Sequence, residues 1–410
     1  MGIVSKSGGG GGETGGNAAM DAGGGQDEIR TNLPPRTGPI CGRRDEMQAI
    51  VDAFNKAQQE KRSGVVEVTG KLGTGATTVA VELARRAGGR FPGGAWLLRA
   101  DLGPDLAWAD LAACRGETVT TSLAESARIE RERAAAEPRS LIVVDGVTAD
   151  TDLDAVLPDL SGAGADIFLV TTEPTGTMDE VVHVAAVPDQ APRRIAHAVL
   201  RVKDAEEEVE VPVVRVTDGL AITASLAARV AVAHHPDGPA RSLADLPAAL
   251  MQIVPLVAQH PAALELLLVC GVAHPTLITA DALYGAIGNL RARRGLDFEG
   301  DDVGNGVLHL VRLGLLSLDE ESRVSMHPLL QEAVRAMAST DADLRIAREG
   351  LAQGLIDEAE AAVTEEGVDV RRCGLHQMRY LRDTSEGETQ TQLAAAIAKV
   401  ETALGIGGEA

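Results

Sequence analysis

A glycine-rich segment between a predicted strand and a predicted helix holds the residues best suited to bind phosphate. It reads GKLGTGATT over residues 70–78 and matches GxxxxGK[ST] at every position but one, because Ala76 replaces the expected lysine. Glycines let backbone N–H groups converge on phosphate oxygens, and the start of the next helix adds positive potential. We therefore predict a phosphate-binding loop, or P-loop, without its lysine. The candidate contacts are Gly70, Lys71, Gly73, Thr74, Gly75, Ala76, Thr77 and Thr78.

Two oxygen-bearing side chains have the types and spacing to hold a magnesium ion beside that loop. Thr77 supplies a hydroxyl directly after Ala76, and Asp145 ends the apolar run SLIVVD of residues 140–145. A loop hydroxyl and a carboxylate of this kind hold Mg²⁺ in phosphate-binding proteins. An apolar strand that ends in Asp is a weak signal alone, but it follows the loop at a suitable distance. We expect Thr77 and Asp145 to form the magnesium pair.

The surrounding sequence supplies the elements that must position these residues. Short apolar runs at residues 65–69, 96–99, 141–144 and 166–171 alternate with stretches of helical character. This alternation predicts an α/β fold in which a parallel sheet is covered by helices on both faces. The glycine-rich loop follows the first of these strands and precedes a helix, which is the context that a P-loop requires.

Composition and periodicity divide the rest of the chain. Residues 1–30 hold 11 glycines and almost no large apolar residue, which predicts a flexible tail. Beyond residue 221 the pattern is mostly helical, except that two short apolar runs flank Asp-Glu-Glu-Ser, as in the hairpin of a winged helix. We predict a disordered tail over 1–32, a P-loop nucleotide-binding domain over 33–205, a helical subdomain over 206–262, a winged-helix subdomain over 263–340 and a C-terminal helical segment over 341–410.

Charge and composition exclude several classes of protein. Asp and Glu number 60 against 38 Lys and Arg, a net charge of −22 that disfavours binding along a nucleic acid backbone. Aromatic residues are 2%, which leaves few side chains for base stacking. The longest apolar run, residues 266–273, is too short to span a bilayer, and the start of the chain lacks the apolar region of a secretory signal. We expect a soluble cytoplasmic protein without a membrane or nucleic acid partner.

The order of motifs resembles the NB-ARC, or STAND, class of signalling ATPases over residues 33–340. Besides the P-loop and the strand ending in Asp145, the motifs are CGRRDE at 41–46, VTTE at 170–173, DGLAI at 218–222 and MHPLL at 326–330. The resemblance implies that Arg43 belongs to a segment over the adenine and Thr172 to a sensor strand. It further implies that His327 holds a phosphate of ADP in a resting state, and that ADP or ATP with Mg²⁺ is the cofactor.

Four departures from that family's pattern concern catalysis and binding. Besides Ala76, Gly146 replaces the second acidic residue after the strand, Glu173 replaces the sensor arginine, and Ala221 replaces a proline that packs on the adenine. Enzymes of phosphoryl transfer work mainly by charge stabilisation and water activation, so these changes predict negligible ATP turnover. The resemblance implies a nucleotide-dependent switch or scaffold that controls assembly with a protein partner or with itself, in bacterial regulation or antiphage defence.

Three features keep other interpretations open. Lys71 stands at the second loop position, where partition-type ATPases carry a signature lysine, and it would allow a slow, active ATPase. The basic residues at 291–294 lie next to the predicted winged helix and would suit a transcription regulator with a vestigial nucleotide domain. His327 precedes Pro328 and would instead cap a helix, because proline is favoured at the first helical position.

Overall fold

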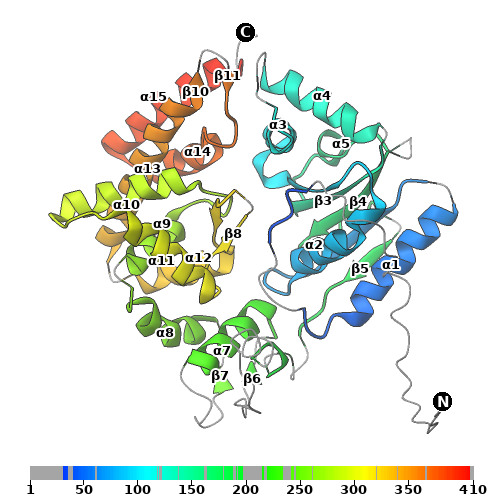
Figure 1. Cartoon of the computed structure of the whole chain (residues 1–410), viewed down its shortest axis with the longest axis horizontal. Coiled ribbons are helices and arrows are strands. Elements are labelled where there is room, and N and C mark those ends of the chain that lie inside the picture. The colour runs from blue at the N-terminus through cyan, green and yellow to red at the C-terminus, as the bar shows by residue number, and fades with distance from the viewer. Residues whose placement is uncertain are drawn as a thin grey trace, which may run out of the picture.

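The computed structural model describes residues 31–35, 40–60, 62–117, 119, 122–136, 138–160, 164–178, 180–187, 191, 193–196, 215–216, 219–233, 242–243, 246–260, 262–319, 321–338, 340–364 and 367–406. Nearly all of the predicted glycine-rich tail, together with Asp218, lies outside these residues. Figure 1 shows two halves side by side: an α/β half that contains the elements up to β5, and a helical half formed by α7 to α15.

Five parallel strands form the sheet of the α/β half. Their order is β2–β3–β4–β1–β5. The bounds are β1 (Val65–Thr69), β2 (Ala95–Arg99), β3 (Ser140–Val147), β4 (Ala165–Thr171) and β5 (Val181–His183). Because all strands run the same way, the loop after β1 and the carboxylate at the end of β3 lie at one edge of the sheet, with β4 between them.

Helices cover both faces of this sheet. Helices α1 (Arg44–Gln59) and α2 (Ala76–Ala87) share an apolar core with Leu141 and Val143 of β3. On the other face, α3 (Pro104–Cys114), α4 (Leu123–Ala135) and α5 (Leu153–Val156) share one with Ile142 and Val144. Successive side chains of a strand point to opposite faces, so an unbroken apolar run is buried on both sides. The predicted α/β fold is confirmed.

The helical half follows the sheet in the chain. Its helices are α7 (Ala221–Ala233), α8 (Leu246–Val257), α9 (Ala263–Val272), α10 (Ala280–Arg294), α11 (Gly300–Arg312), α12 (Pro328–Met337), α13 (Asp341–Ala362), α14 (Leu375–Thr384) and α15 (Gly387–Ala403). Its short strands are β6 (Arg215–Val216), β7 (Ser242–Leu243), β8 (Ser317–Leu318), β9 (Val324–Ser325), β10 (Val363–Thr364) and β11 (Gly367–Val368). Strands β8 and β9 form an antiparallel hairpin at the predicted place, shorter than the two apolar runs.

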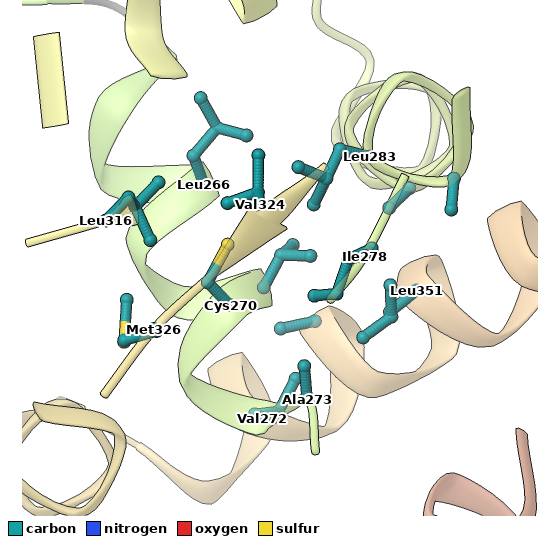
Figure 2. Packing of buried hydrophobic residues seen from close by; sticks show 14 of the residues in the cluster. Leu266, Cys270, Val272, Ala273, Ile278, Leu283, Leu316, Val324, Met326 and Leu351 are labelled. Carbon is teal, nitrogen blue, oxygen red and sulfur yellow. The ribbon is translucent and has the colours of Figure 1, made fainter. Parts of the chain in front are cut away.

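One apolar core runs through the helical half. Figure 2 shows its centre, where Leu266 and Cys270 of α9 lie beside Val324 of β9 and near Leu351 of α13. All four side chains are buried. Because Leu351 belongs to the predicted C-terminal segment, α13 is part of the same packed core as the helices before it. Within the described part of the chain, no helix has both the length and the apolar character to cross a membrane.

Two glycines allow α10 and α13 to cross closely. A Cβ added at Gly285 would lie 3.0 Å from Cα of Gly354, and one added at Gly354 would lie 2.3 Å from the carbonyl oxygen of Ala282. We expect Gly354→Ala to destabilise the protein, because overpacking by about 1–3 kcal/mol outweighs the gain of roughly 1 kcal/mol that alanine has over glycine in a helix. Urea unfolding followed by circular dichroism measures the change.

The control for this prediction is Gly89→Ala, at a position where an added Cβ meets nothing within 4 Å. Its free energy of unfolding should stay within about 0.5 kcal/mol of the wild type or rise slightly. A Gly354→Ala protein as stable as this control would show that the two helices do not cross as closely as described.

Candidate nucleotide-binding site

The loop after β1 has the backbone form of a phosphate-binding loop. Gly73 and Gly75 have φ angles of 85° and 95°, in the left-handed region that favours glycine. Gly75 precedes α2, and no side chain caps that helix, so its first N–H groups are available to an anion. The N–H of Gly70 donates to the carbonyl oxygen of Thr171 at 3.0 Å, which ties the loop to the end of β4.

Arg43 supports the middle of the loop. Its side chain is buried, and Nη2 donates to the carbonyl oxygen of Thr74 at 2.7 Å while Nη1 donates to Glu46 at 2.8 Å. Thr74 in turn donates from Oγ1 to the carbonyl oxygen of Lys71 at 2.7 Å. Arg43 therefore acts on the loop backbone from the start of α1, and its place over an adenine stays a prediction.

The two residues predicted to hold magnesium meet at the edge of the sheet. Oγ1 of Thr77 donates to Oδ1 of Asp145 at 2.9 Å. Burial raises the pKa of Asp145, against the lowering effects of the nearby Arg99 guanidinium and the Thr77 hydrogen bond. A hydroxyl oxygen and a carboxylate at this spacing fit the hard oxygen donors that Mg²⁺ prefers. Among the residues that the structure describes, no group of three or more His, Cys, Asp or Glu side chains could hold a metal.

Asp101 takes the space in which a side chain at position 146 would begin. Gly146 has a φ of 80°, and a Cβ added there would lie 3.0 Å from Oδ1 of Asp101. Arg99 donates to Asp101 through Nε at 3.0 Å and Nη2 at 2.7 Å. Burial acts to raise the pKa of Asp101, but the Arg99 guanidinium holds it below its usual range. Sequence reasoning missed this pair, because Arg99 comes to lie opposite Asp145 only through the pairing of β2 with β3.

Glu67, in the strand that leads into the P-loop, is a further residue near the site that sequence reasoning missed. It is fully buried in β1, and its carboxylate accepts hydrogen bonds from Oγ1 of Thr171 at 2.8 Å and from the N–H of Thr175 at 2.8 Å. These bonds pin the end of β4 to the strand that leads into the P-loop. Thr172 and Glu173 follow the pinned residue and are exposed. The available signal was a charged residue inside the apolar run Val-Val-Glu-Val.

Two helices of the helical half begin against the P-loop. The N–H of Ile222, in α7, donates to the carbonyl oxygen of Gly73 at 3.2 Å. A Cβ added at Gly73 would lie 2.8 Å from Cδ1 of Leu329 in α12 and 3.2 Å from Cγ2 of Ile222. The DGLAI and MHPLL motifs, 104 residues apart at Ile222 and Met326, are thus brought to the same loop.

His327 caps α12, as one of the two interpretations of its motif requires. Its Nδ1 accepts the N–H of Leu329 at 3.2 Å, and Pro328 is the first residue of the helix. Burial lowers the pKa of His327 to about 4, so the ring is neutral at pH 7. Because Nδ1 accepts a hydrogen bond, the remaining ring proton is on Nε2, which is a donor. The cap and a contact with an anion are therefore compatible.

Lys71 and the arginines at 291–294, which left an active ATPase and a transcription regulator open as interpretations, have different surroundings. Lys71 is exposed, and its amino group makes no hydrogen bond or ion pair with the residues that the structure describes. The arginines at 291–294 are paired with acidic side chains: Arg291 with Glu265, Arg293 with Glu349 and Arg294 with Asp343. This cluster therefore presents little uncompensated positive charge to a nucleic acid.

Comparison with known proteins agrees with this fold. No protein-family model matches the chain, and no curated protein does. Among solved structures, a signal transduction ATPase with numerous domains (STAND) and a tetratricopeptide repeat sensor from Pyrococcus horikoshii matches with a TM-score of 0.50 at 13% identity. The match covers 92% of this chain and 54% of that one, so the chain spans about half of its neighbour's length.

Two further solved structures match less closely. The ORC2 protein of Aeropyrum pernix has a TM-score of 0.35 at 14% identity, over 74% of this chain and 95% of that one. Cdc6p of Pyrobaculum aerophilum has 0.32 at 13%, over 78% and 96%. The sheet, the loop and the STAND match together define an α/β P-loop NTPase fold. Within that class the fold is STAND-like, and a helical part follows it in the chain. At sequence identities this low, the likeness concerns the fold alone.

Proposed function

We propose that this protein is a nucleotide-dependent switch that binds ADP or ATP at the loop after β1 and hydrolyses ATP slowly or not at all. The observation that carries the proposal is the contact of α7 and α12 with Gly73 of that loop. A nucleotide at the loop would touch the α/β half and lie beside two elements of the helical half. Its presence would therefore bias how the halves pack, which is what a switch requires.

Each predicted site residue has a distinct part in this proposal. Backbone N–H groups of the loop and of the first turn of α2 would hold the phosphates, and Nε2 of His327 would donate to one of them. Thr77 and Asp145 would hold Mg²⁺, which supplies positive charge to the phosphates when bound. Thr78 and Lys71 are exposed beside the loop. Thr172, next to the pinned end of β4, would face the terminal phosphate.

The missing charges argue against rapid hydrolysis. Ala76 is buried and provides no cation, and the space beside Gly146 is filled by an Asp101 already paired with Arg99. Exposed Glu173 adds a negative charge after β4. Without the loop lysine, and with Asp101 engaged by Arg99 rather than by water, little lowers the barrier for attack on the γ-phosphate.

We expect ATP turnover below about one per minute, since the charge stabilisation that speeds phosphoryl transfer is absent. Phosphate release from Mg²⁺–ATP by the purified chain measures it. A faster rate that is lost in Asp145→Ala would contradict the proposal. A faster rate lost in Lys71→Ala would favour the second candidate, a slow ATPase, which the exposed amino group of Lys71 supports, since it has no partner among the residues that the structure describes.

The variant His327→Asn separates the two roles of that residue, the cap of α12 and the proposed contact with a phosphate. Asparagine is a good helix cap, so the free energy of unfolding should change by less than about 0.5 kcal/mol. A lost hydrogen bond to a charged phosphate should weaken ADP binding roughly tenfold or more. Calorimetric titration with ADP checks this, and Ser122→Ala, which removes the cap of α4, should leave ADP affinity unchanged. Unchanged affinity in His327→Asn would leave His327 with the capping role alone.

The output of the switch belongs to the same proposal. A change in packing between the halves would expose or cover surfaces for a protein partner or for a second copy of the chain. The pairing of the arginines at 291–294 with acidic residues supports a protein partner over a nucleic acid. Bacterial regulation and antiphage defence, which the family resemblance implies, are settings in which such a switch would act, within the cytoplasm.

A further inference from the structure

A cavity of about 60 Å³ lies where the α/β half meets the C-terminal part of the helical half. Helix α3 contributes Leu106 and Asp110 to its wall, and the segment before α14 contributes Val370 and Arg371. One enclosed water needs roughly 10–15 Å³. The cavity therefore has room for a group of several heavy atoms.

Three of the polar groups in the wall are guanidiniums, and they come from separate parts of the chain; Thr276, His376 and Gln377 are further polar lining residues. Arg99 ends β2, Arg323 precedes β9, and Arg371 follows β11. The side chain of Arg371 is 8% exposed, and its Nε has no hydrogen-bond partner among the described residues. Buried guanidinium donors at a cavity favour a planar or tetrahedral oxyanion as ligand.

Asp110 is the acidic side chain that lines the cavity among the described residues. Its Oδ1 lies 3.0 Å from Nη1 of Arg323 and 3.6 Å from Nε of Arg371. Both arginines also have acidic partners that do not line the cavity: Arg323 pairs with Asp319, and Arg371 with Glu321. An incoming anion would therefore compete with Asp110 and would leave the other pairs in place.

The wall also has an aliphatic part. Leu102, Leu106, Leu277, Val370 and Leu375 form it. Cavities that combine an apolar lining with a few convergent polar groups, at the junction of two structural units, are typical small-molecule sites. The lining thus calls for a ligand with a short aliphatic body besides its anionic group.

We propose that this cavity binds a small molecule bearing a carboxylate or a phosphate on a short aliphatic body, and that the anion competes with Asp110 for Arg323 and Arg371. Asp110 belongs to the α/β half, whereas both arginines belong to the helical half. Occupation of the cavity would loosen this connection between the halves. This last consequence rests on the proposed switch, but binding itself does not.

The test uses calorimetric titration of the full chain with butyrate and, separately, with inorganic phosphate. Each titration is made with and without ADP, at constant ionic strength. Arg371→Gln removes one guanidinium, and Arg372→Gln is the matched control, because the neighbouring Arg372 is 45% exposed and does not line the cavity. Asp110→Asn removes the competing carboxylate while it keeps the shape of the side chain.

We expect saturable binding of butyrate, of phosphate in the presence of ADP, or of both. The probe that binds shows whether the anionic group of the ligand is a carboxylate or a phosphate. Binding should weaken at least tenfold in Arg371→Gln, stay within twofold of the wild type in Arg372→Gln, and tighten in Asp110→Asn. No saturable binding of either probe to the wild type would overturn the proposal. Equal weakening in both arginine variants, or weaker binding in Asp110→Asn, would do so as well.

A measurement on the wild type keeps the test valid if Arg371→Gln fails to fold. Butyrate methylene protons should give nuclear Overhauser effects to methyl groups that line the cavity, such as those of Leu106 and Val370. Contacts only to methyl groups outside the cavity wall would place the ligand elsewhere and overturn the proposal. The titration of ADP alone reports on the loop after β1, so loss of ADP binding with butyrate binding intact would reject the proposed switch and leave this cavity assigned.

Discussion

Replacing Asp110 with alanine is expected to lower the free energy of unfolding by up to about 3 kcal/mol, because it removes a largely buried carboxylate and leaves the Arg323 guanidinium with Asp319 as its acidic partner. Asp110 of α3 accepts from Nη1 of Arg323 at 3.0 Å, and their side chains are 14% and 9% exposed. Arg323 keeps its contact with Asp319 at 2.7 Å, so the cost should fall at the low end for such pairs. Urea unfolding at pH 7 measures it.

The control for this variant is Asp105→Ala on the same helix. Asp105 is exposed in the first turn of α3, and its removal should cost no more than about 0.5 kcal/mol. A protease should also cleave the Asp110→Ala protein faster in the chain between its two halves under native conditions, since Asp110 joins the halves. If both variants were equally stable, Asp110 would not hold the halves together.

Gly73→Val has the second large expected effect. A β-branched residue at a φ of 85° costs roughly 1–2 kcal/mol or more. Contact with Cδ1 of Leu329 at 2.8 Å adds an overpacking cost of about 1–3 kcal/mol. We therefore expect a loss of roughly 2–5 kcal/mol in the free energy of unfolding, together with a loss of ADP binding. Unfolding in urea and calorimetric titration measure the two losses.

Gly116→Val separates backbone strain from contact. Gly116 has a φ of 88°, and an added Cβ there meets nothing within 4 Å. The difference between the two variants reports the cost of separating α12 and α7 from the loop. Adding Leu329→Ala to Gly73→Val should restore part of that difference. If Gly73→Val and Gly116→Val lost the same free energy, the helical half would not rest on the P-loop.

The sequence was sufficient for β1 to β4 because each of these strands is a mainly apolar run that is largely buried on both faces. Runs predicted at 65–69, 141–144 and 166–171 appear as strands, and the helix after the P-loop begins at Ala76. Strand β5 was not predicted, since three residues, Val181–His183, carry too little periodicity. The Thr77–Asp145 contact was predictable because a P-loop and a carboxylate-ended strand imply a shared sheet edge.

Contacts that depend on the order of strands or on packing between halves were not predictable. Arg99 meets the site only because β2 pairs with β3, an order that no local pattern fixes. The ion pairs of Asp110 join residues that are at least 213 positions apart in the chain, and no periodicity links them. His327 was predictable in part: the cap of the helix that begins at Pro328 was one of two interpretations and is observed, whereas its contact with a phosphate stays a prediction.

Titration of nucleotide-stripped protein with ADP tests the central claim most directly. The account expects saturable binding of one ADP per chain, although Ala76 replaces the loop lysine, because backbone N–H groups and Thr77 remain at the loop and His327 would donate to a phosphate from the start of α12. The same titration should lose most of its heat in Gly73→Val, in which the loop is distorted. Absence of saturable ADP binding in the wild type, with or without Mg²⁺, would contradict the account.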